Sequence, residues 1–246
     1  MSIQSARSSI DAVVVKLGGS LLDLPDLMDR LKALAEQLLP APVLLITGGG
    51  VAAEFVRSLD QRFGLTSEQA HWTAIAAMSF NASLLERLNS ELRVVTDRAD
   101  AEAVWSAGRI AVLDALAFLR SQEESRLCEK GEGTIVAVRS ANQACARRSV
   151  HGANNDSAVD FERLPPSWDV TSDSIAAWIA AQWRFSELVI AKSCDPVSPC
   201  IATLVENRML DPFFRNVPGT VNIQWLNLRK SPLSLIPLND NNRPSP

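Results

Sequence analysis

Short apolar runs alternate with longer amphipathic segments along most of this chain, and this alternation limits the folds that it can adopt. The apolar runs predict β-strands at residues 13–16, 43–47, 92–95, 110–113, 134–138, 188–191 and 221–228. The amphipathic segments predict helices at residues 25–39, 51–63, 67–88, 100–107, 115–125 and 171–184. In the helix at 51–63 we expect Phe55, Val56 and Leu59 to face inward. Strands that alternate with helices form βαβ units, whose right-handed crossovers build a mostly parallel sheet. We therefore expect an α/β sandwich that binds ligands at the sheet edge where strands run into helices.

Polar stretches set the expected boundaries of this unit. Residues 1–11 are polar and rich in serine, so they predict a flexible N-terminus without the apolar segment of a signal peptide. Residues 239–246 predict a flexible tail, which leaves residues 12–238 as one domain. The polar stretch at 140–167 predicts a mobile loop or a boundary between lobes. The two lobes expected on either side of it span about 12–165 and about 166–238.

Glycine clusters follow the first two expected strands. The first cluster is Gly18, Gly19 and Ser20, and the second is Gly48, Gly49 and Gly50. A strand that runs through glycines into a helix presents backbone N–H groups to an anion at the positive end of the helix dipole. The alternative for the second cluster is a tight turn, but such a turn needs one glycine and seldom three. The alternative for Ser20 is that it caps the helix that follows. The spacing matches neither a P-loop nor a Rossmann fingerprint, but two anion sites at one edge indicate phosphoryl transfer.

Two lysines and an aspartate stand at the ends of expected elements on this edge. Lys16 and Lys192 each end an apolar strand, and Asp173 lies in the first turn of a helix. Ammonium groups there could stabilise a transferring phosphoryl group, and a carboxylate between them would hold both in position. The alternative is structural, with lysines leaving the sheet into solvent and Asp173 simply favouring the helix dipole.

Two further side chains are candidates for contact with a substrate. His71 opens the long helix at 67–88 and is either a structural histidine or a substrate contact. Trp168 precedes the helix that carries Asp173 and is either part of the core or a wall against an aromatic ring.

Composition narrows the class of protein. The formal net charge of −4 and the absence of a dominant basic stripe argue against a nucleic-acid partner. No apolar run is long enough to span a membrane. The four cysteines show no spacing typical of metal ligands or disulfides; they are Cys128, Cys145, Cys194 and Cys200. We therefore expect reduced thiols, no metal held by the protein and a cytoplasmic location.

Taken together, the two glycine clusters, Thr171-Ser172-Asp173 and the late Lys192 resemble the amino acid kinase superfamily. Residues 167–174, which read Ser-Trp-Asp-Val-Thr-Ser-Asp-Ser, resemble the signature of a branch that contains [5-(aminomethyl)furan-3-yl]methyl phosphate kinase of methanofuran biosynthesis. Residues 70–72 and 191–193 are also similar to bacterial members of that branch.

This resemblance implies a three-layer αβα sandwich that transfers the γ-phosphoryl group of ATP, with Mg²⁺, to a small phosphomonoester in one-carbon cofactor biosynthesis. It implies an acceptor lobe at about 12–165 and a nucleotide lobe at about 166–238. Lys16, Asp173 and Lys192 would be catalytic, and nucleotide would contact Gly18, Gly19, Ser20, Ser193 and Asp195. The acceptor would contact Gly48, Gly49, Gly50, His71, Trp168 and Thr171. After Lys192 the chain departs from the Asp-Gly sequence common in relatives and reads Ser-Cys-Asp-Pro.

Two other functions fit the same residues. The enzyme could phosphorylate another acceptor, such as an amino acid carboxylate or a nucleoside monophosphate. Alternatively, the chain could be a non-catalytic sensor of nucleotide or metabolite, although a sensor would have little reason to keep both lysines and Asp173. The resemblance is also compatible with a homo-oligomer, since family members commonly form dimers or larger assemblies.

Overall fold

A computed structural model describes residues 11–130, 164–216 and 220–239 of the chain. Four expectations from the sequence fall outside these residues. They are the strand at 134–138, most of the polar stretch at 140–167, and nearly all of the flexible N-terminus and tail. The division into two lobes remains a prediction.

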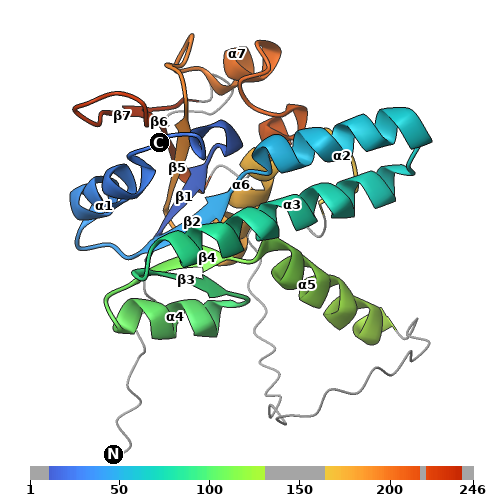
Figure 1. Ribbon diagram of the computed structural model, residues 1–246, viewed down its shortest axis with the longest axis horizontal. Helices are drawn as coiled ribbons and strands as arrows, with labels where there is room; N and C mark the ends of the chain where they lie inside the picture. The colour runs from blue at the N-terminus through green and yellow to red at the C-terminus, as the bar shows by residue number, and fades with distance from the viewer. Residues whose placement is uncertain (1–10, 131–163, 217–219, 240–246) are drawn as a thin grey trace, which may run out of the picture.

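The centre of the described structure is a seven-stranded sheet with the order β3-β4-β2-β1-β5-β6-β7 (Figure 1). All neighbouring strands are parallel except β7, which runs antiparallel to β6 at the edge. The strands are β1 Val13–Leu17, β2 Val43–Thr47, β3 Leu92–Val95, β4 Ile110–Leu113, β5 Glu187–Lys192, β6 Asn222–Asn227 and β7 Leu235–Pro237. β1 and β2 are buried along their whole length, as expected for central strands covered on both faces.

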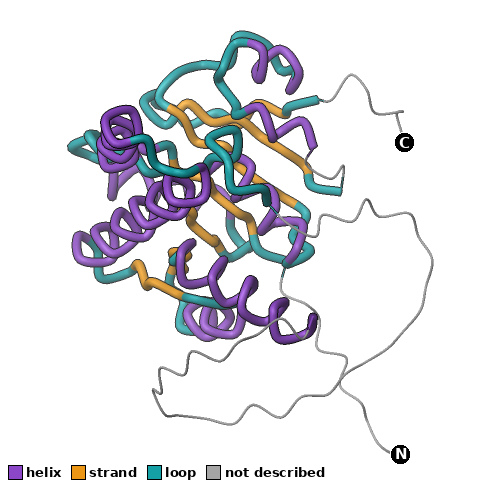
Figure 2. Tube along the Cα trace, turned by 90° about the vertical axis from the view of Figure 1, so that its right-hand side faces the viewer, coloured by secondary structure: helices purple, strands orange, loops and turns teal. Residues whose placement is uncertain are grey.

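Helices cover both faces of this sheet, and Figure 2 shows the strands running between them. They are α1 Leu27–Leu38, α2 Gly50–Phe63, α3 Ser67–Leu88, α4 Arg98–Ser106, α5 Ala115–Lys130, α6 Ser172–Gln182 and α7 Ile201–Glu206, with short 3₁₀ helices η1 Gly19–Leu21 and η2 Pro212–Asn216. One core contains α1 and the end of α3, and the other contains α4, α5 and α6. The predicted α/β fold, a three-layer αβα sandwich with a mostly parallel sheet, is therefore confirmed.

The alternation of side chains along β1 and β5 brings two cations to one face. Val13, Val15 and Leu17 belong to the core beneath α1, whereas Val14 belongs to the core that contains α6. Because successive side chains point to opposite faces, Lys16 lies on the face of Val14. On β5, Leu188 and Ile190 belong to the α6 core, and Lys192 continues their side of the strand. Both lysines therefore reach the carboxyl edge of the sheet on the face that α6 covers.

Helix α6 is buried because it is apolar on every side. Every residue from Ser172 to Ala180 is buried, including the aspartate and two serines of its first turn. The helix packs against β1, β2 and β5. Its N-terminus therefore meets the ends of the strands that carry the two lysines.

Three local features differ from the sequence-based expectation. The first glycine cluster leads only into η1, and the following helix α1 begins at Leu27, so no α-helix dipole points at Gly18–Ser20. The C-terminal part contains α7, η2 and β7, whose short patterns carry little periodicity. Phe55, expected to face inward, is 63% exposed, and Val56 is the buried residue of α2.

Candidate active site

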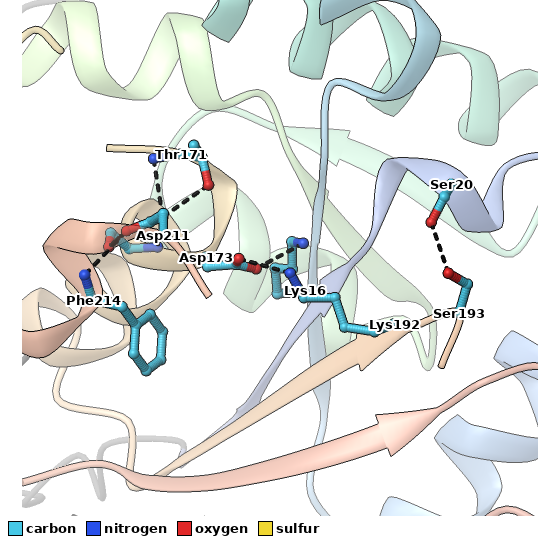
Figure 3. A network of polar contacts seen from close by, with 9 residues as sticks. Lys16, Ser20, Thr171, Asp173, Lys192, Ser193, Asp211 and Phe214 are labelled. Atoms are coloured by element: carbon cyan, nitrogen blue, oxygen red, sulfur yellow. Dashed lines mark hydrogen bonds and ion pairs between the residues drawn. The ribbon is translucent and has the colours of Figure 1, made fainter. Parts of the chain in front are cut away.

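Lys16 and Lys192 share the carboxylate of Asp173 (Figure 3). The ammonium nitrogen of Lys16 lies 2.7 Å from Oδ1 of Asp173, and that of Lys192 lies 2.7 Å from Oδ2. Lys16 and Asp173 are each 3% exposed. Among the described residues, no second carboxylate lies within ion-pairing distance of either ammonium group. The structure therefore brings the three predicted catalytic side chains together and leaves one positive charge in excess.

Burial and charge shift the pKa values of this cluster. Burial lowers the pKa of Lys16 to about 8, and repulsion from Lys192 adds to this shift, although the attraction of Asp173 opposes it. Burial alone would raise the pKa of Asp173, but the two ammonium groups outweigh it and lower this pKa to about 2. Asp173 is thus ionised at neutral pH and is a poor proton acceptor.

The first turn of α6 is held by Asp211, a buried residue that sequence reasoning missed. Its carboxylate accepts hydrogen bonds from the backbone N–H of Thr171 at 3.0 Å and of Ser174 at 3.1 Å. It also accepts the hydroxyl groups of Thr171 and Ser174, and the N–H of Phe214 at 3.0 Å (Figure 3). The N-terminal end of α6 therefore binds the carboxylate of Asp211. Thr171, an expected substrate contact, donates both its backbone N–H and its hydroxyl to this carboxylate.

The two glycine clusters pack directly against each other. A Cβ atom on Gly19 would lie 2.2 Å from the backbone nitrogen of Gly50, and one on Gly48 would lie 2.7 Å from the nitrogen of Gly19. On Gly49, a Cβ would lie 2.4 Å from the Cβ of Ala53. These contacts, which fall below any ordinary van der Waals distance, explain much of the need for glycine without a ligand.

The glycine amides divide into two groups. The N–H of Gly18 donates to the carbonyl of Ala191 at 2.9 Å, and that of Gly48 donates to Leu17 at 2.7 Å. These two amides hold the loops against the strands. Within the described residues, the amides of Gly19, Gly49 and Gly50 have no acceptor, and no side chain caps α2. Such amides can bind an anion.

Asn81, in the middle of α3, supports the second glycine cluster and was also missed. It is 4% exposed, and its side-chain amide donates to the carbonyl of Gly48 at 2.8 Å and of Gly49 at 3.0 Å. The only sequence signal is an asparagine inside a helix, where this residue is unfavourable unless its amide has a partner.

The predicted nucleotide contacts lie at the ends of β1, β5 and β6. The hydroxyl groups of Ser20 and Ser193 are 3.2 Å apart (Figure 3). Asp195 accepts from Asn227 at 3.0 Å and pairs with Lys230 at 2.6 Å, so its pKa is lowered, mainly by Lys230. Arg229, from the same turn, donates to the carbonyl of Ser20 at 3.0 Å. Sequence reasoning missed Arg229 and Lys230 at this place, because they follow β6, which is distant along the chain.

A small cavity of about 80 Å³ lies beside the second glycine cluster. Gly49, His71, Trp168 and Ser172 contribute to its wall, together with the apolar side chains Ile75 and Met78. Trp168 is fixed at its edge, since its indole N–H donates to Asp60 at 2.7 Å and Arg57 stacks on the ring at 4.4 Å. The buried His71 packs edge-on against Trp72. Four expected substrate contacts thus border one cavity, namely Gly49, His71, Trp168 and Thr171.

Two lysines on one shared carboxylate, beside glycine loops at the carboxyl edge of a parallel sheet, fit a phosphotransferase of the kinase class. A model of the amino acid kinase family matches residues 11–207. The chain belongs to the amino acid kinase family, and it is a kinase.

Solved structures of nucleotide kinases share this fold. Uridylate kinase from Archaeoglobus fulgidus is 18% identical, over 93% of this chain and 91% of its own, with a TM-score of 0.52. UMP kinase from Ureaplasma parvum is 13% identical, with coverages of 89% and 91% and a TM-score of 0.54. UMP kinase from Bacillus anthracis is 12% identical, with coverages of 90% and 89% and a TM-score of 0.53. A comparison with curated protein sequences finds no match. Within the described residues, no helix has the length and apolar character to cross a membrane.

Proposed function

We propose that this kinase transfers the γ-phosphoryl group of ATP to a small phosphomonoester and forms a diphosphate. The observation that supports this most is the pair of ammonium groups on one carboxylate, with Lys16 buried and Lys192 partly buried. A buried cation without a matching anion is costly, so this cluster favours the arrival of negative charge. In phosphoryl transfer, charge neutralisation and positioning supply most of the catalysis.

In the proposed step, an oxygen of the acceptor phosphate attacks the γ-phosphorus of ATP. The bond between the γ-phosphorus and the oxygen that bridges the β- and γ-phosphates breaks at the same time. The products are ADP and the diphosphate of the acceptor, so no proton has to be removed from the nucleophile. A phosphomonoester with a second pKa of about 6 is already a dianion at neutral pH. This suits a site whose central carboxylate, with a pKa of about 2, is a poor base. Lys16 and Lys192 would stabilise the transferring group while Asp173 holds them in place.

The two glycine loops would receive the two phosphate groups. We assign the ATP phosphates to the first loop, where Gly19 and Ser20 lie beside Ser193, with Gly18 shaping the turn and Asp195 further along the edge. The acceptor phosphate would bind the amides of Gly49 and Gly50, with Gly48 as their anchor to β1. Because the loops are in contact, the donor and acceptor phosphates would meet at Lys16 and Lys192.

The described residues contain no group of three or more His, Cys, Asp or Glu side chains that could hold a metal ion. Lysines and backbone amides surround the proposed phosphate sites, which suits a Mg²⁺ ion that the nucleotide phosphates carry. Such an ion would neutralise charge on the β- and γ-phosphates.

A small acceptor fits the cavity beside the second glycine cluster. A volume of about 80 Å³ has room for roughly half a dozen water molecules, which suits a single ring with short arms. We therefore propose [5-(aminomethyl)furan-3-yl]methyl phosphate as the acceptor, in methanofuran-type cofactor biosynthesis, in agreement with the resemblance at residues 167–174. Trp168 would cover the furan ring, and His71 would lie beside it. Thr171 would act through Asp211, which accepts hydrogen bonds from its backbone N–H and its hydroxyl.

A nucleoside monophosphate is the second candidate acceptor. The fold that this chain shares with UMP kinases favours it, and a base together with a ribose would extend beyond the small cavity into the solvent to which it opens. The third possibility, a sensor without turnover, would leave Lys16 and Lys192 without a role in catalysis.

Release of ADP from ATP and Mg²⁺ tests the proposal, with the furan phosphate, UMP, isopentenyl phosphate and aspartate as acceptors. Selective turnover of the furan phosphate is the expected result. Preference for UMP would keep the reaction class and reject the acceptor. ATP binding without turnover of any acceptor would favour the sensor. Lys16→Ala should abolish ADP release in a protein that remains folded.

A further inference from the structure

Asn81 donates to two successive carbonyl groups of the second glycine cluster. Its single side-chain nitrogen lies 2.8 Å from the oxygen of Gly48 and 3.0 Å from that of Gly49. A primary amide has two N–H donors, so both are used. The contact is buried and joins α3 to a loop 32 or 33 residues earlier in the chain.

These two hydrogen bonds fix the direction of two peptide groups. In a planar trans peptide, the C=O of one residue and the N–H of the next point in opposite directions. Because the carbonyls of Gly48 and Gly49 point at Asn81, the amides of Gly49 and Gly50 point away from it. Gly49 has right-handed helical torsions, and Gly50 has a φ of +53°. This right-handed and left-handed succession makes consecutive N–H groups converge into an anion-binding nest.

Glycines need such external support because they have little conformational preference of their own. Either peptide group could rotate and place a carbonyl oxygen where an N–H donor is needed. A carbonyl oxygen there would repel a phosphate. Asn81 opposes this rotation, because a turned peptide would lose its hydrogen bond in a buried place.

An independent feature shows that this edge is built for an anion. The hydroxyl of Ser172 would lie 3.2 Å from a Cβ on Gly48, so the glycine loop touches the residue directly before Asp173. Asp173 pairs with the buried ammonium group of Lys16 and the partly buried one of Lys192, which together exceed its negative charge.

We propose that Asn81 is a positioning residue that orients the amides of Gly49 and Gly50 toward the phosphate group of the acceptor. This inference rests on the proposed function in assigning the acceptor phosphate to that loop. Asn81 makes no contact with substrate and acts through the two glycine peptides.

Titration of inorganic phosphate into glycine-labelled ¹⁵N protein tests the inference without any turnover. In the wild type, the amide resonances of Gly49 and Gly50 should shift and saturate. In Asn81→Ala, the dissociation constant for phosphate should rise about tenfold, the loss expected when peptide groups bound to a ligand lose their support. Asn81→Ser, which keeps one donor, should fall between the two and serves if the alanine variant does not fold.

Thr47→Val is the matched control. The hydroxyl of Thr47, next to Gly48, donates to the carbonyl of Met78 on α3 at 2.8 Å in an equally buried place. Its loss removes a contact between the same strand end and the same helix but leaves both glycine carbonyls bound. Thr47→Val should therefore lose stability like Asn81→Ala and keep wild-type affinity for phosphate.

Steady-state kinetics give a second test. Asn81→Ala should raise KM for the acceptor about tenfold and change KM for ATP less than about twofold. Wild-type phosphate affinity in Asn81→Ala, an equal loss in Thr47→Val, or no shift of the Gly49 and Gly50 amides would each overturn the inference. If no acceptor is turned over but phosphate binding still depends on Asn81, the proposed reaction fails and the inference stands.

Discussion

Ser174 donates both its backbone N–H and its hydroxyl to the carboxylate of Asp211, which lies 37 residues later in the chain. Through this pair, the segment that begins η2 holds the first turn of the helix that carries Asp173. The position of the central carboxylate thus depends on the C-terminal part of the chain. Burial, together with the nearby charge of Asp173, raises the pKa of Asp211, while the Ser174 and Thr171 donors oppose this shift.

Replacement of Asp211 should affect both stability and turnover. Asp211→Ala leaves the partly buried amide of Thr171 and the buried amide of Ser174 without an acceptor, so we expect a loss of at least about 2 kcal/mol in the free energy of unfolding. kcat should fall with it because Asp173 loses its fixed place. Urea unfolding and steady-state kinetics measure the two effects. The control is Glu206→Gln. Glu206 is an exposed residue on α7 whose carboxylate pairs with Arg215 at 3.2 Å, so its substitution should change the free energy of unfolding by less than about 1 kcal/mol. Equal effects of the two substitutions would contradict the role of Asp211.

The rate should depend on the protonation of Lys16. Its pKa of about 8 means that the free enzyme loses this positive charge as the pH rises through about 8, and that it is fully charged below. kcat/KM, which reports the free enzyme, should therefore fall above about pH 8. Bound phosphates favour the ammonium form, so the fall in kcat should occur at higher pH. A kcat/KM that stays constant to about pH 10 would show that Lys16 keeps its ordinary pKa.

Asp173→Asn should destabilise the protein more than an exposed substitution of the same kind. It leaves two adjacent ammonium groups with no carboxylate, and breaking a buried ion pair in this way costs about 3–5 kcal/mol. The loss should shrink as the pH rises above neutrality, because Lys16 then releases its proton and the repulsion ends. The free energy of unfolding at pH 7 and at pH 9 measures this. Asp26→Asn, which removes the half-exposed partner of Arg30, should show a small loss at both values.

Gly19→Ala should abolish turnover with a moderate loss of stability. Its new methyl group would collide with the backbone of Gly50, and a backbone cannot move aside like a flexible side chain. The two phosphate loops would then separate. Gly64→Ala is the control, because Gly64 has a φ of +64° and nothing within 4 Å of an added Cβ. It should cost about 1 kcal/mol from backbone strain and leave kcat unchanged. Full activity in Gly19→Ala would show that contact between the loops is dispensable.

Much of this site could be predicted because its signals are local. Lys16 and Lys192 end apolar strands, and strand alternation places each on the α6 face. Asp173 opens a helix, and the glycines interrupt the pattern directly after two strands. The order of elements was sufficient to predict a mostly parallel sheet between helical layers, but it did not predict the order of the strands or the presence of β7.

The supporting residues could not be predicted, because their partners are backbone groups far along the chain. Asn81 binds carbonyls of the second glycine cluster, and Asp211 binds amides of α6. Nothing near either residue in the sequence indicates those partners. Phe55 was predicted wrongly for a related reason, since the periodicity of α2 gives an apolar stripe but does not say how much of it the protein covers. The lobes and the individual substrate contacts remain predictions.

The contact between Gly19 and Gly50 also restricts how this protein can evolve. Every single-base change in a glycine codon that alters the amino acid adds a Cβ atom, and each of these two positions meets the backbone of the other within 3 Å of that atom. Changing one partner does not make room for the other, because the obstacle is main chain in both directions. No single substitution at either position is therefore tolerated without a shift of the backbone. Descendants of this sequence can vary the residues of the cavity wall, but we expect Gly19 and Gly50 to stay glycine.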